Sequence, residues 1–294
     1  MLCLDRNGSA VNTYENPTGL FRFLYDCAAG RLLLGGVIRP WLSKLVGRFL
    51  DSRLSRIIIG PFIRKSGIDM SEYESGPFRS FNEFFRREIL PGRRCFGTEE
   101  DTVSSPCDGK LQVFSVDDEL RFEIKGISYT MRSLLRCDEL AERFAGGTLM
   151  LLRLSVDDYH RYAYPVSGTE SGRVHLGGVL HTVDPFAAER RPIYCENSRE
   201  YSVIETESMG AVMMMEVGAL MVGRIVNRHA VGEVHRGEEK GFFEFGASSI
   251  LLCFEKGAVL PDADILKNTA AGAETLVKMG ERIALASRTA AAAK

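Results

Sequence analysis

The pattern of hydrophobic and polar positions changes between the N-terminal quarter of this chain and the rest of it. From Leu20 to Phe49, large apolar residues alternate with arginines and lysines at roughly helical spacing, which predicts short amphipathic helices. From about Val103 to Ser249, short apolar or alternating runs recur between turn signals, which predicts a β-rich body. We therefore expect an α+β fold that is rich in β-structure, with amphipathic helices at its N-terminus.

Individual runs predict individual elements. The segment Phe78–Glu88 predicts a short amphipathic helix, which Pro91 and Gly92 end. A helix is expected near Met131–Phe144, and another over Asp262–Met279. The runs expected to form strands are 111–114, 149–154, 201–204, 212–217, 222–226 and 282–286. The small-residue tail 288–294 is expected to fray.

The predicted N-terminal helices carry a strong positive charge. Between Pro17 and Lys65 there are nine basic and two acidic residues, a net charge of +7 in a chain whose total is -2. The same segment holds Trp41, the one tryptophan of the chain. Interleaved basic and apolar residues are typical of helices that lie in an anionic membrane interface. An ordinary helical subdomain or a partner-binding surface is the alternative, and nucleic acid is disfavoured because aliphatic residues dilute the positive charge.

Length and composition set wider bounds. A chain of 294 residues that is 45% hydrophobic is long enough for one large or two small domains with a true core. Its seven cysteines are scattered, odd in number and without a C-x-x-C spacing. No uncharged run approaches the length that spans a bilayer. These features favour a reducing, cytoplasmic compartment, without disulfides, structural zinc or a transmembrane helix.

A turn of small residues near the C-terminus, Gly246–Ser249, separates two apolar runs. A serine on so tight a turn can bring its hydroxyl onto the carbonyl of the preceding peptide bond, which is the geometry of an N-to-O acyl shift. Small-residue turns more often simply join two strands. The turn therefore indicates chemistry only in combination with other motifs.

Three further positions are candidates for chemistry in the β-rich body. Asp108 lies in an Asp-Gly turn just before a predicted strand, and His160 follows the apolar run 149–156. His181 lies in the segment Leu180–Pro185. Each also has an ordinary structural explanation, because Asp-Gly turns and satisfied histidines are common in folded proteins.

Together these motifs resemble the phosphatidylserine decarboxylases, most closely the branch found in Gram-positive bacteria. The motifs follow the order of that family: the Asp108 turn, Asp158–Arg161, Leu180–Pro185, Glu196–Glu200, Glu216–Ala219 and the Gly246–Ser249 turn. The resemblance spans roughly residues 78–280. It implies antiparallel sheets in a barrel-like or sandwich catalytic body over residues 78–294, preceded by a membrane-associating region over residues 1–77.

Members of that family make their cofactor from their own chain. The resemblance implies that the Ser248 hydroxyl attacks the carbonyl of Ala247, and that elimination and hydrolysis leave a pyruvoyl group at position 248. The products are a β chain of residues 1–247 and an α chain of residues 248–294. The pyruvoyl group then forms a Schiff base with the serine headgroup of phosphatidylserine, and loss of carbon dioxide yields phosphatidylethanolamine. This chemistry needs no metal, PLP or nucleotide.

The resemblance also implies roles for single residues. Asp108 either orients a histidine base or acts directly on the reactive serine. His160 is the candidate general acid of the decarboxylation, because imidazole titrates near neutral pH. His181 is a second candidate for assisting self-cleavage. Arg161 and Arg199 are candidates for binding the headgroup phosphate.

The chain departs from the family pattern at two positions. Ala163 stands where many members have a second histidine, three residues after His160, and Ala247 stands where a glycine usually precedes the reactive serine. The resemblance implies a peripheral enzyme on the cytoplasmic face of the membrane and leaves a homodimer open. Two alternatives also stay open: a lipid-binding pseudoenzyme that does not process, and a decarboxylase of a related lipid such as archaetidylserine.

Overall fold

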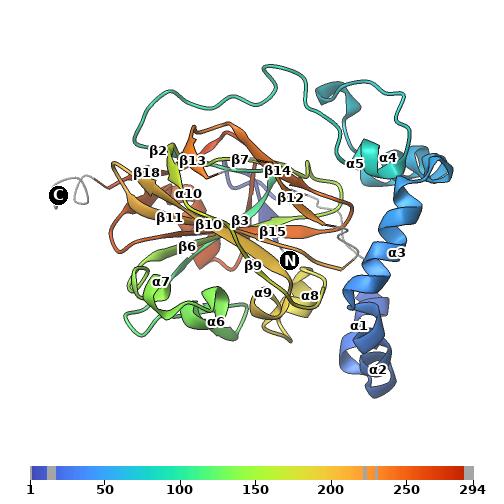
Figure 1. Ribbon diagram of the computed structural model, residues 1–294, viewed down its shortest axis with the longest axis horizontal. Coiled ribbons are helices and arrows are strands. Elements are labelled where there is room, and N and C mark those ends of the chain that lie inside the picture. Colours follow the sequence, from blue (N-terminus) through green and yellow to red (C-terminus); the bar gives the residue numbers. More distant parts are fainter. Residues whose placement is uncertain (1, 12–17, 221–223, 229–230, 288–294) are drawn as a thin grey trace.

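The N-terminal helices form a column along one side of a body made of sheets in the computed structural model of the chain (Figure 1). The structure describes residues 2–11, 18–220, 224–228 and 231–287. The α+β architecture rich in strands is as the sequence predicts. The expected fraying of residues 288–294 concerns residues outside these ranges.

The largest sheet is almost entirely antiparallel and is open. Its strands follow the order β1-β17-β3-β6-β15-β11-β10-β8-β13, with β9 beside β10, and β1 pairs with β17 in parallel. The order does not return to its first strand, so the described strands form no closed barrel, which corrects the barrel-like expectation. The strands are β1 (Cys3–Leu4), β3 (Gly109–Ser115), β6 (Thr148–Leu154), β8 (Gly168–Glu170), β9 (Val174–Leu176), β10 (Arg199–Thr206), β11 (Gly210–Val217), β13 (Gly232–Val234), β15 (Ser248–Phe254) and β17 (Glu274–Val277).

Smaller sheets complete the body. One joins β12 (Ile225–Asn227), β14 (Glu239–Phe243) and β7 (Arg161–Ala163), and another joins β16 (Val259–Pro261), β18 (Arg282–Ala286) and β2 (Thr102–Ser104). A two-stranded sheet pairs β4 (Arg121–Ile124) with β5 (Ile127–Thr130). Because β14 and β15 belong to different sheets, the small-residue turn between them is a crossing from one sheet to another and not a hairpin.

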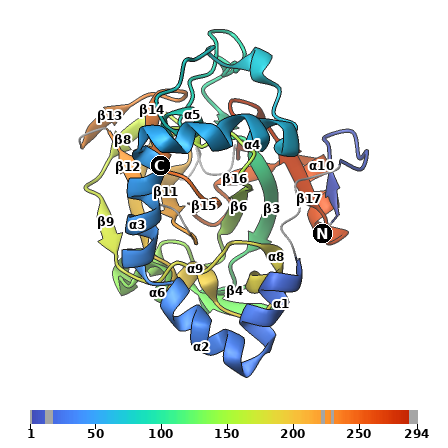
Figure 2. The same ribbon diagram turned by 90° about the vertical axis from the view of Figure 1, so that its right-hand side faces the viewer.

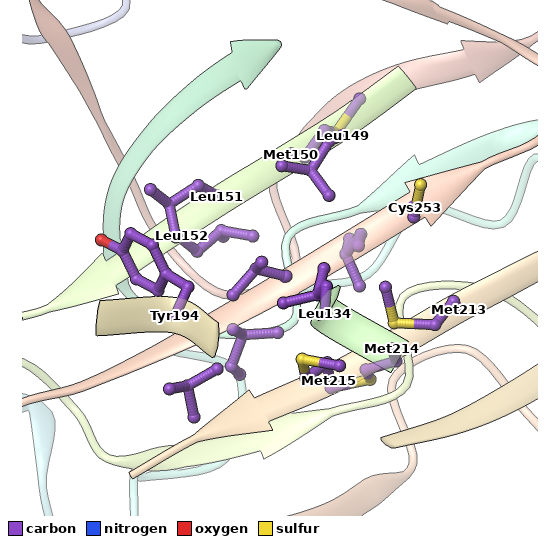
Figure 3. Close-up of a cluster of buried hydrophobic side chains, with 14 of the residues drawn as sticks. Leu134, Leu149, Met150, Leu151, Leu152, Tyr194, Met213, Met214, Met215 and Cys253 are labelled. Atoms are coloured by element: carbon purple, nitrogen blue, oxygen red, sulfur yellow. The ribbon is translucent and has the colours of Figure 1, made fainter. Parts of the chain in front are cut away.

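The core lies where strands of the large sheet are covered on both faces. Consecutive residues Leu149–Leu152 of β6 and Met213–Met215 of β11 are all buried, and so is the whole of β15. Figure 3 shows their side chains packed with Leu134 of α6 (Met131–Leu135) and Tyr194 of α9 (Ile193–Glu196). Continuous apolar runs without alternation are the expected pattern for strands buried on both faces.

Helices are confirmed over Leu20–Phe49, where the sequence predicts them, as α1 (Thr18–Asp26), α2 (Ala28–Val37) and α3 (Pro40–Asp51). The 3-10 turns η1 (Arg53–Ile58) and η2 (Met70–Glu72) and the helix α4 (Ile59–Ser66) lie outside the predicted segments, and α5 (Phe81–Phe85) takes up only the middle of the predicted helix 78–88. Pro40 occupies the first turn of α3, where its missing N–H is no loss. Gly30 lies inside α2, at the point where α1 and α2 come closest. A Cβ there would lie 1.8 Å from the Phe23 carbonyl oxygen.

Two predicted helices differ from the structure. The segment 131–144 forms two short helices, α6 and α7 (Asp138–Glu142), because Arg136 adopts a left-handed conformation with φ 52° at the end of α6. The segment 262–279 is helical only in α10 (Ala263–Ala270), after which Gly272, with a φ of 73°, turns the chain into β17. One further short helix is α8 (Pro185–Ala188). Of the strand expected over 222–226, β12 takes up Ile225–Asn227, and positions 222 and 223 lie outside the described ranges.

The helical column has an inner and an outer face. Its inner residues Phe21, Leu24, Tyr25, Leu34 and Ile38 belong to the same buried cluster as the sheet core, so a domain boundary at residue 77 stays a prediction. Large apolar residues on its outer face are exposed, namely Leu20, Phe23, Leu32, Leu33, Trp41, Leu45, Phe49, Leu54 and Ile57. Among the described residues, no helix has both the length and the apolar character needed to traverse a bilayer.

Candidate active site

The sequence motifs gather at one end of the large sheet. The strands β6 and β11 end there, whereas β3 and β15 begin there, because all these neighbours are antiparallel. The register pairs Ser248 with Leu154 of β6 and Ser249 with Val217 of β11. Figure 2, which looks from the side of the helical column, shows the helices standing in front of the body. The loops that carry His160 and Asp108 leave from the same end.

Ser248 is the first residue of β15 and is fully buried. Its Oγ has no hydrogen-bond partner within the described part of the chain, although buried hydroxyls normally have one. The conformation that requires glycine falls on Gly246, with a φ of 136°, so an alanine at position 247 fits the turn. Ser249 follows in the strand and therefore points to the opposite face of the sheet. These features leave the Ser248 hydroxyl free to react.

His160 is also buried and offers one free nitrogen. Its Nδ1 lies 3.0 Å from the carbonyl oxygen of Asp158, and because a carbonyl only accepts, Nδ1 carries the proton. Nε2 has no partner among the described residues. Burial lowers the pKa of His160 to about 4, so the imidazole is neutral near pH 7 and Nε2 presents a lone pair.

An aromatic side chain of α5 connects His160 with the small-residue turn. The Phe85 ring lies 4.2 Å from the imidazole and 5.1 Å from the ring of Phe245, measured between centroids. The Phe243 N–H donates to the carbonyl oxygen of His160, which ties β14 to the histidine loop. The Ser80 hydroxyl, which accepts from the Glu83 N–H, caps α5 and fixes where the helix begins. Of the predicted helix 78–88, Phe85 therefore packs directly on the histidine ring.

A buried ion pair holds the histidine loop. The Asp158 carboxylate accepts from Lys110 Nζ and from the Ser155 N–H, both at 2.6 Å. Lys110 is 2% exposed and lies on β3. Lys110 was not among the residues predicted from the sequence, although a lysine inside a buried strand beside an Asp-Gly turn is a usable signal.

Asp108 has partners other than the predicted ones. Its carboxylate accepts from Arg94 through Nε at 2.9 Å and Nη2 at 2.5 Å, and from the Met279 N–H at 2.8 Å. The strand β6 separates β3 from β15, so Asp108 lies roughly 10 Å from Ser248 in the plane of the sheet. Orientation of a histidine by Asp108 stays a prediction, and Arg94 is a partner that the sequence analysis missed.

Ala163, the position of the first departure from the family pattern, is buried in β7. Its N–H donates to the Pro106 carbonyl oxygen at 2.8 Å. It lines a cavity of about 560 Å³ together with Met279, the residue whose N–H holds Asp108. The space beside the Asp108 turn is therefore open where a larger side chain would otherwise lie.

His181 is held on the β11 side of the turn. Its Nδ1 lies 3.0 Å from the Tyr25 hydroxyl of α1, and its Nε2 lies 3.2 Å from the Glu196 carboxylate. The backbone N–H of His181 donates to Asn197 Oδ1. Asn197 Nδ2 in turn donates to the carbonyl oxygen of Gly218, just after β11. His181 therefore links the helical column to the end of the sheet, and the hydrogen bond to Glu196 helps to lower the pKa of that carboxyl.

The two arginines predicted to bind phosphate differ in their surroundings. Arg199 is fully buried and donates to backbone carbonyls, at 2.8 Å to Leu134 and 2.7 Å to Cys195. Its guanidinium holds a turn together, so the structure gives no support for a role in phosphate binding. Arg161 lines a surface cavity but is already paired with Glu239 and Glu88, each at 2.8 Å.

A second buried charge cluster lies just before the turn, and sequence reasoning missed it. Lys240 of β14 donates to Glu216 of β11 at 2.7 Å and lies 3.6 Å from Glu170. All three side chains are almost fully buried. Burial raises the pKa of Glu216, while the Lys240 ammonium opposes that shift. The cluster fastens the small sheet to the large one directly upstream of Gly246.

The residues present fit a pyruvoyl group made from the chain itself. Such a group requires a serine on a tight turn, and Ser248 meets this with a buried hydroxyl that has no acceptor among the described residues. Within the described ranges, no cluster of histidine, cysteine, aspartate and glutamate side chains could hold a metal ion.

Comparison with known proteins shows the family of the chain. The family model for phosphatidylserine decarboxylase matches residues 81–285. Phosphatidylserine decarboxylase proenzyme 2 of Clostridium acetobutylicum is 44% identical over 271 residues, covering 92% of each chain. The phosphatidylserine decarboxylase proenzymes of Ruminiclostridium cellulolyticum and Fusobacterium nucleatum are 42% and 38% identical, each over 270 residues and 90% of both chains. The resemblance that the motifs indicate is confirmed, and this chain belongs to the phosphatidylserine decarboxylase family.

Proposed function

We propose that the chain is a proenzyme that cleaves itself between Ala247 and Ser248 and then decarboxylates phosphatidylserine to phosphatidylethanolamine. The observation that supports this proposal is that two buried groups without a hydrogen-bond partner among the described residues lie at the same end of the large sheet. They are the Ser248 hydroxyl and the neutral His160 Nε2. Family membership supplies the substrate class.

In the self-cleavage, His160 Nε2 takes the proton of Ser248 Oγ as the oxygen attacks the carbonyl carbon of Ala247. The peptide C–N bond breaks, an ester forms, and the amine of residue 248 is released. Loss of the Cα proton expels the Ala247 carboxylate and leaves dehydroalanine. Addition of water and loss of ammonia then convert dehydroalanine to the pyruvoyl group.

His160 also serves the decarboxylation. The pyruvoyl group supplies a ketone that condenses with the substrate amine and accepts the electron pair when carbon dioxide leaves. His160 Nε2 takes up a proton that the substrate ammonium gives up as its nitrogen condenses, and then returns that proton to the substrate carbon. Its lowered pKa makes that imidazolium a ready donor, and the Phe85 ring packed against it keeps water away.

The remaining predicted residues act through position. Asp108 fixes the segment around Met279 and Arg94 at the start of β3, and Asp158 fixes the loop of His160. His181 fixes Asn197 and α1 against the end of β11. We assign these groups to the support of the site and His160 to proton transfer.

A location at the membrane follows from the same proposal. The outer face of the helical column exposes Leu32, Leu33 and Trp41 among basic residues, next to the end of the sheet that carries Ser248. Such a face fits the interface of an anionic bilayer. We propose a peripheral enzyme on the cytoplasmic face, whose two chains arise from one precursor.

Intact-mass measurement tests the self-cleavage. The wild-type chain should yield two polypeptides, the smaller beginning at position 248 with a pyruvoyl group. Ser248→Ala should give only the 294-residue chain and no decarboxylation, whereas Ser249→Ala, the matched control, should still cleave. A wild-type chain that stays whole would favour the lipid-binding pseudoenzyme, and cleavage of Ser248→Ala would move the reactive serine to Ser249.

A further inference from the structure

Arg87 is a buried arginine that no carboxylate neutralises among the described residues. It is 2% exposed, and its Nε and Nη1 have no hydrogen-bond acceptor there. Nη2 approaches the backbone carbonyls of Asp157 and Asp158, at 3.4 Å each. A buried cation with unused donors is costly, so its presence indicates that an anion completes the site.

The guanidinium is held in place by aromatic rings, and Arg87 is one of the residues that line a cavity. Its central carbon lies 4.3 Å from the ring centroid of Tyr73 and 5.2 Å from that of Phe84. Arg87 lines a cavity of about 430 Å³, a size that suits a small-molecule headgroup. Stacking on two rings fixes the plane of the guanidinium, which favours recognition of an oxyanion by two parallel hydrogen bonds.

Two other arginines of this cavity are already neutralised. Arg161 is paired with Glu239 and Glu88, and Arg228 lies 2.9 Å from Glu239. Arg86, the fourth arginine of the cavity, is half-buried, and its Nε donates to the Asn82 carbonyl oxygen at 3.2 Å. Arg87 is therefore the fully buried arginine of this cavity that has no carboxylate partner among the described residues.

Arg87 lies beside the group proposed to transfer the proton. The carbonyl oxygen of Asp158 contacts both Arg87 Nη2, at 3.4 Å, and His160 Nδ1, at 3.0 Å. Phe85, two residues before Arg87, packs on the imidazole ring of His160. An anion bound by Arg87 would therefore lie close to the reacting end of the substrate.

We propose that Arg87 binds the phosphate diester of the serine phospholipid and so positions its amine for reaction at residue 248. The inference rests on the proposed function. In the headgroup, two carbons and one oxygen separate the amine from the phosphorus, so both ends can be held together. The carboxylate is a poor ligand for Arg87, because a cation there would stabilise the ground state that must lose carbon dioxide.

The test compares Arg87→Gln with Arg93→Gln, an exposed arginine on the same segment. Binding of dihexanoyl phosphatidylethanolamine, which carries the phosphate but no carboxylate, is measured by calorimetry beside inorganic phosphate. Loss of a charged hydrogen-bonding partner should weaken binding of the lipid roughly 10-fold to 100-fold in Arg87→Gln. The KM for dihexanoyl phosphatidylserine should rise in parallel. Arg93→Gln should match the wild type, and self-cleavage should proceed in both variants.

Arg87→Lys keeps the proposal testable if the glutamine variant does not fold. It retains the charge without the planar fork, so lipid binding should weaken less than in Arg87→Gln but measurably. Unchanged lipid binding in a folded variant would overturn the proposal, as would weaker binding of phosphatidylserine with unchanged binding of phosphatidylethanolamine, which would place the carboxylate at Arg87. Binding of inorganic phosphate without the lipid would reduce the site to one for free phosphate and overturn it too. Because phosphatidylethanolamine binding needs no chemistry, this test stands even if the wild type fails to cleave or decarboxylate.

Discussion

At the scale of single residues, the charge state of His160 controls the proposed chemistry. An ordinary imidazole has a pKa of 6.5, and burial lowers that of His160 to about 4. In the proposed self-cleavage His160 acts as a base and is active in its neutral form. A lower pKa keeps the imidazole neutral, and therefore active, down to a lower pH. Desolvation is the largest cause of the shift, and the nearby positive charges of Arg87 and Lys110 act in the same direction.

The rate of self-cleavage should therefore stay level from pH 8 to about pH 5 and fall only as the pH approaches 4. Precursor recovered unfolded from inclusion bodies can be refolded at each pH, and the fraction of cleaved chain followed by mass spectrometry. His160→Ala should cleave far more slowly at every pH, because the proposed base is absent. A wild-type rate that halves near pH 6.5 would show that the base is an exposed imidazole or another group.

Sequence motifs predicted some residues of the candidate site, whereas others are recognised only from their packing in the structure. Ser248, His160 and His181 were identified because their local sequence resembles a family pattern. Arg87 and Arg94 escaped notice because an arginine in a charged segment usually lies on the surface. Only the fold shows that Arg87 is buried under Tyr73 and Phe84, and that Arg94 takes the carboxylate of Asp108.

At the scale of elements, the contact between α1 and α2 depends on a missing side chain. Gly30→Ala would place a Cβ 1.8 Å from the Phe23 carbonyl oxygen, so the helices must move apart. We expect a loss of about 1–3 kcal/mol in the free energy of unfolding. Gly35→Ala in the same helix meets nothing within 4 Å and should be neutral or stabilising by up to ~1 kcal/mol.

Thermal unfolding in a Ser248→Ala background, where the chain stays whole, measures both changes. The comparison is informative because the two substitutions add the same methyl group to the same helix. Equal midpoints for Gly30→Ala and Gly35→Ala would contradict the close packing of α1 against α2.

The hydrophobic periodicity predicted where strands and helices lie better than it predicted where each helix ends. The buried runs of β6, β10 and β11 stand where the sequence indicates strands, since continuous apolar runs of that length leave few alternatives. The predicted helix over 131–144 was too long because a left-handed arginine carries no sequence signal. The glycine that ends α10 lies among alanines, which favour a helix and hid the return to β17.

At the scale of the whole molecule, the exposed apolar face of the helical column should govern membrane binding. Replacing Leu32, Leu33 and Trp41 with serine leaves the inner face intact, whereas deleting residues 1–50 would remove Tyr25 and other core residues. We expect the triple variant to bind phosphatidylserine vesicles roughly tenfold or more weakly in flotation. High salt should weaken the wild type as well.

Leu260→Ser supplies the control, because Leu260 is 60% exposed and lies in β16, outside the N-terminal helices. Its vesicle binding should equal that of the wild type. Equal binding by the triple variant would assign the column to another partner.

The place of β15 in the large sheet gives maturation a thermodynamic consequence. In the proposed self-cleavage the bond before Ser248 is cut, so β15, which is hydrogen-bonded between β6 and β11, becomes the start of a separate chain. The mature protein is therefore a complex of two polypeptides woven through one sheet, and its refolding is a second-order reaction. Refolding yield after denaturation should fall on dilution for the cleaved enzyme and stay constant for Ser248→Ala, as recovered native protein would show. The intact chain therefore folds in a unimolecular reaction, whereas the two cleaved chains must first associate before the same fold can form again.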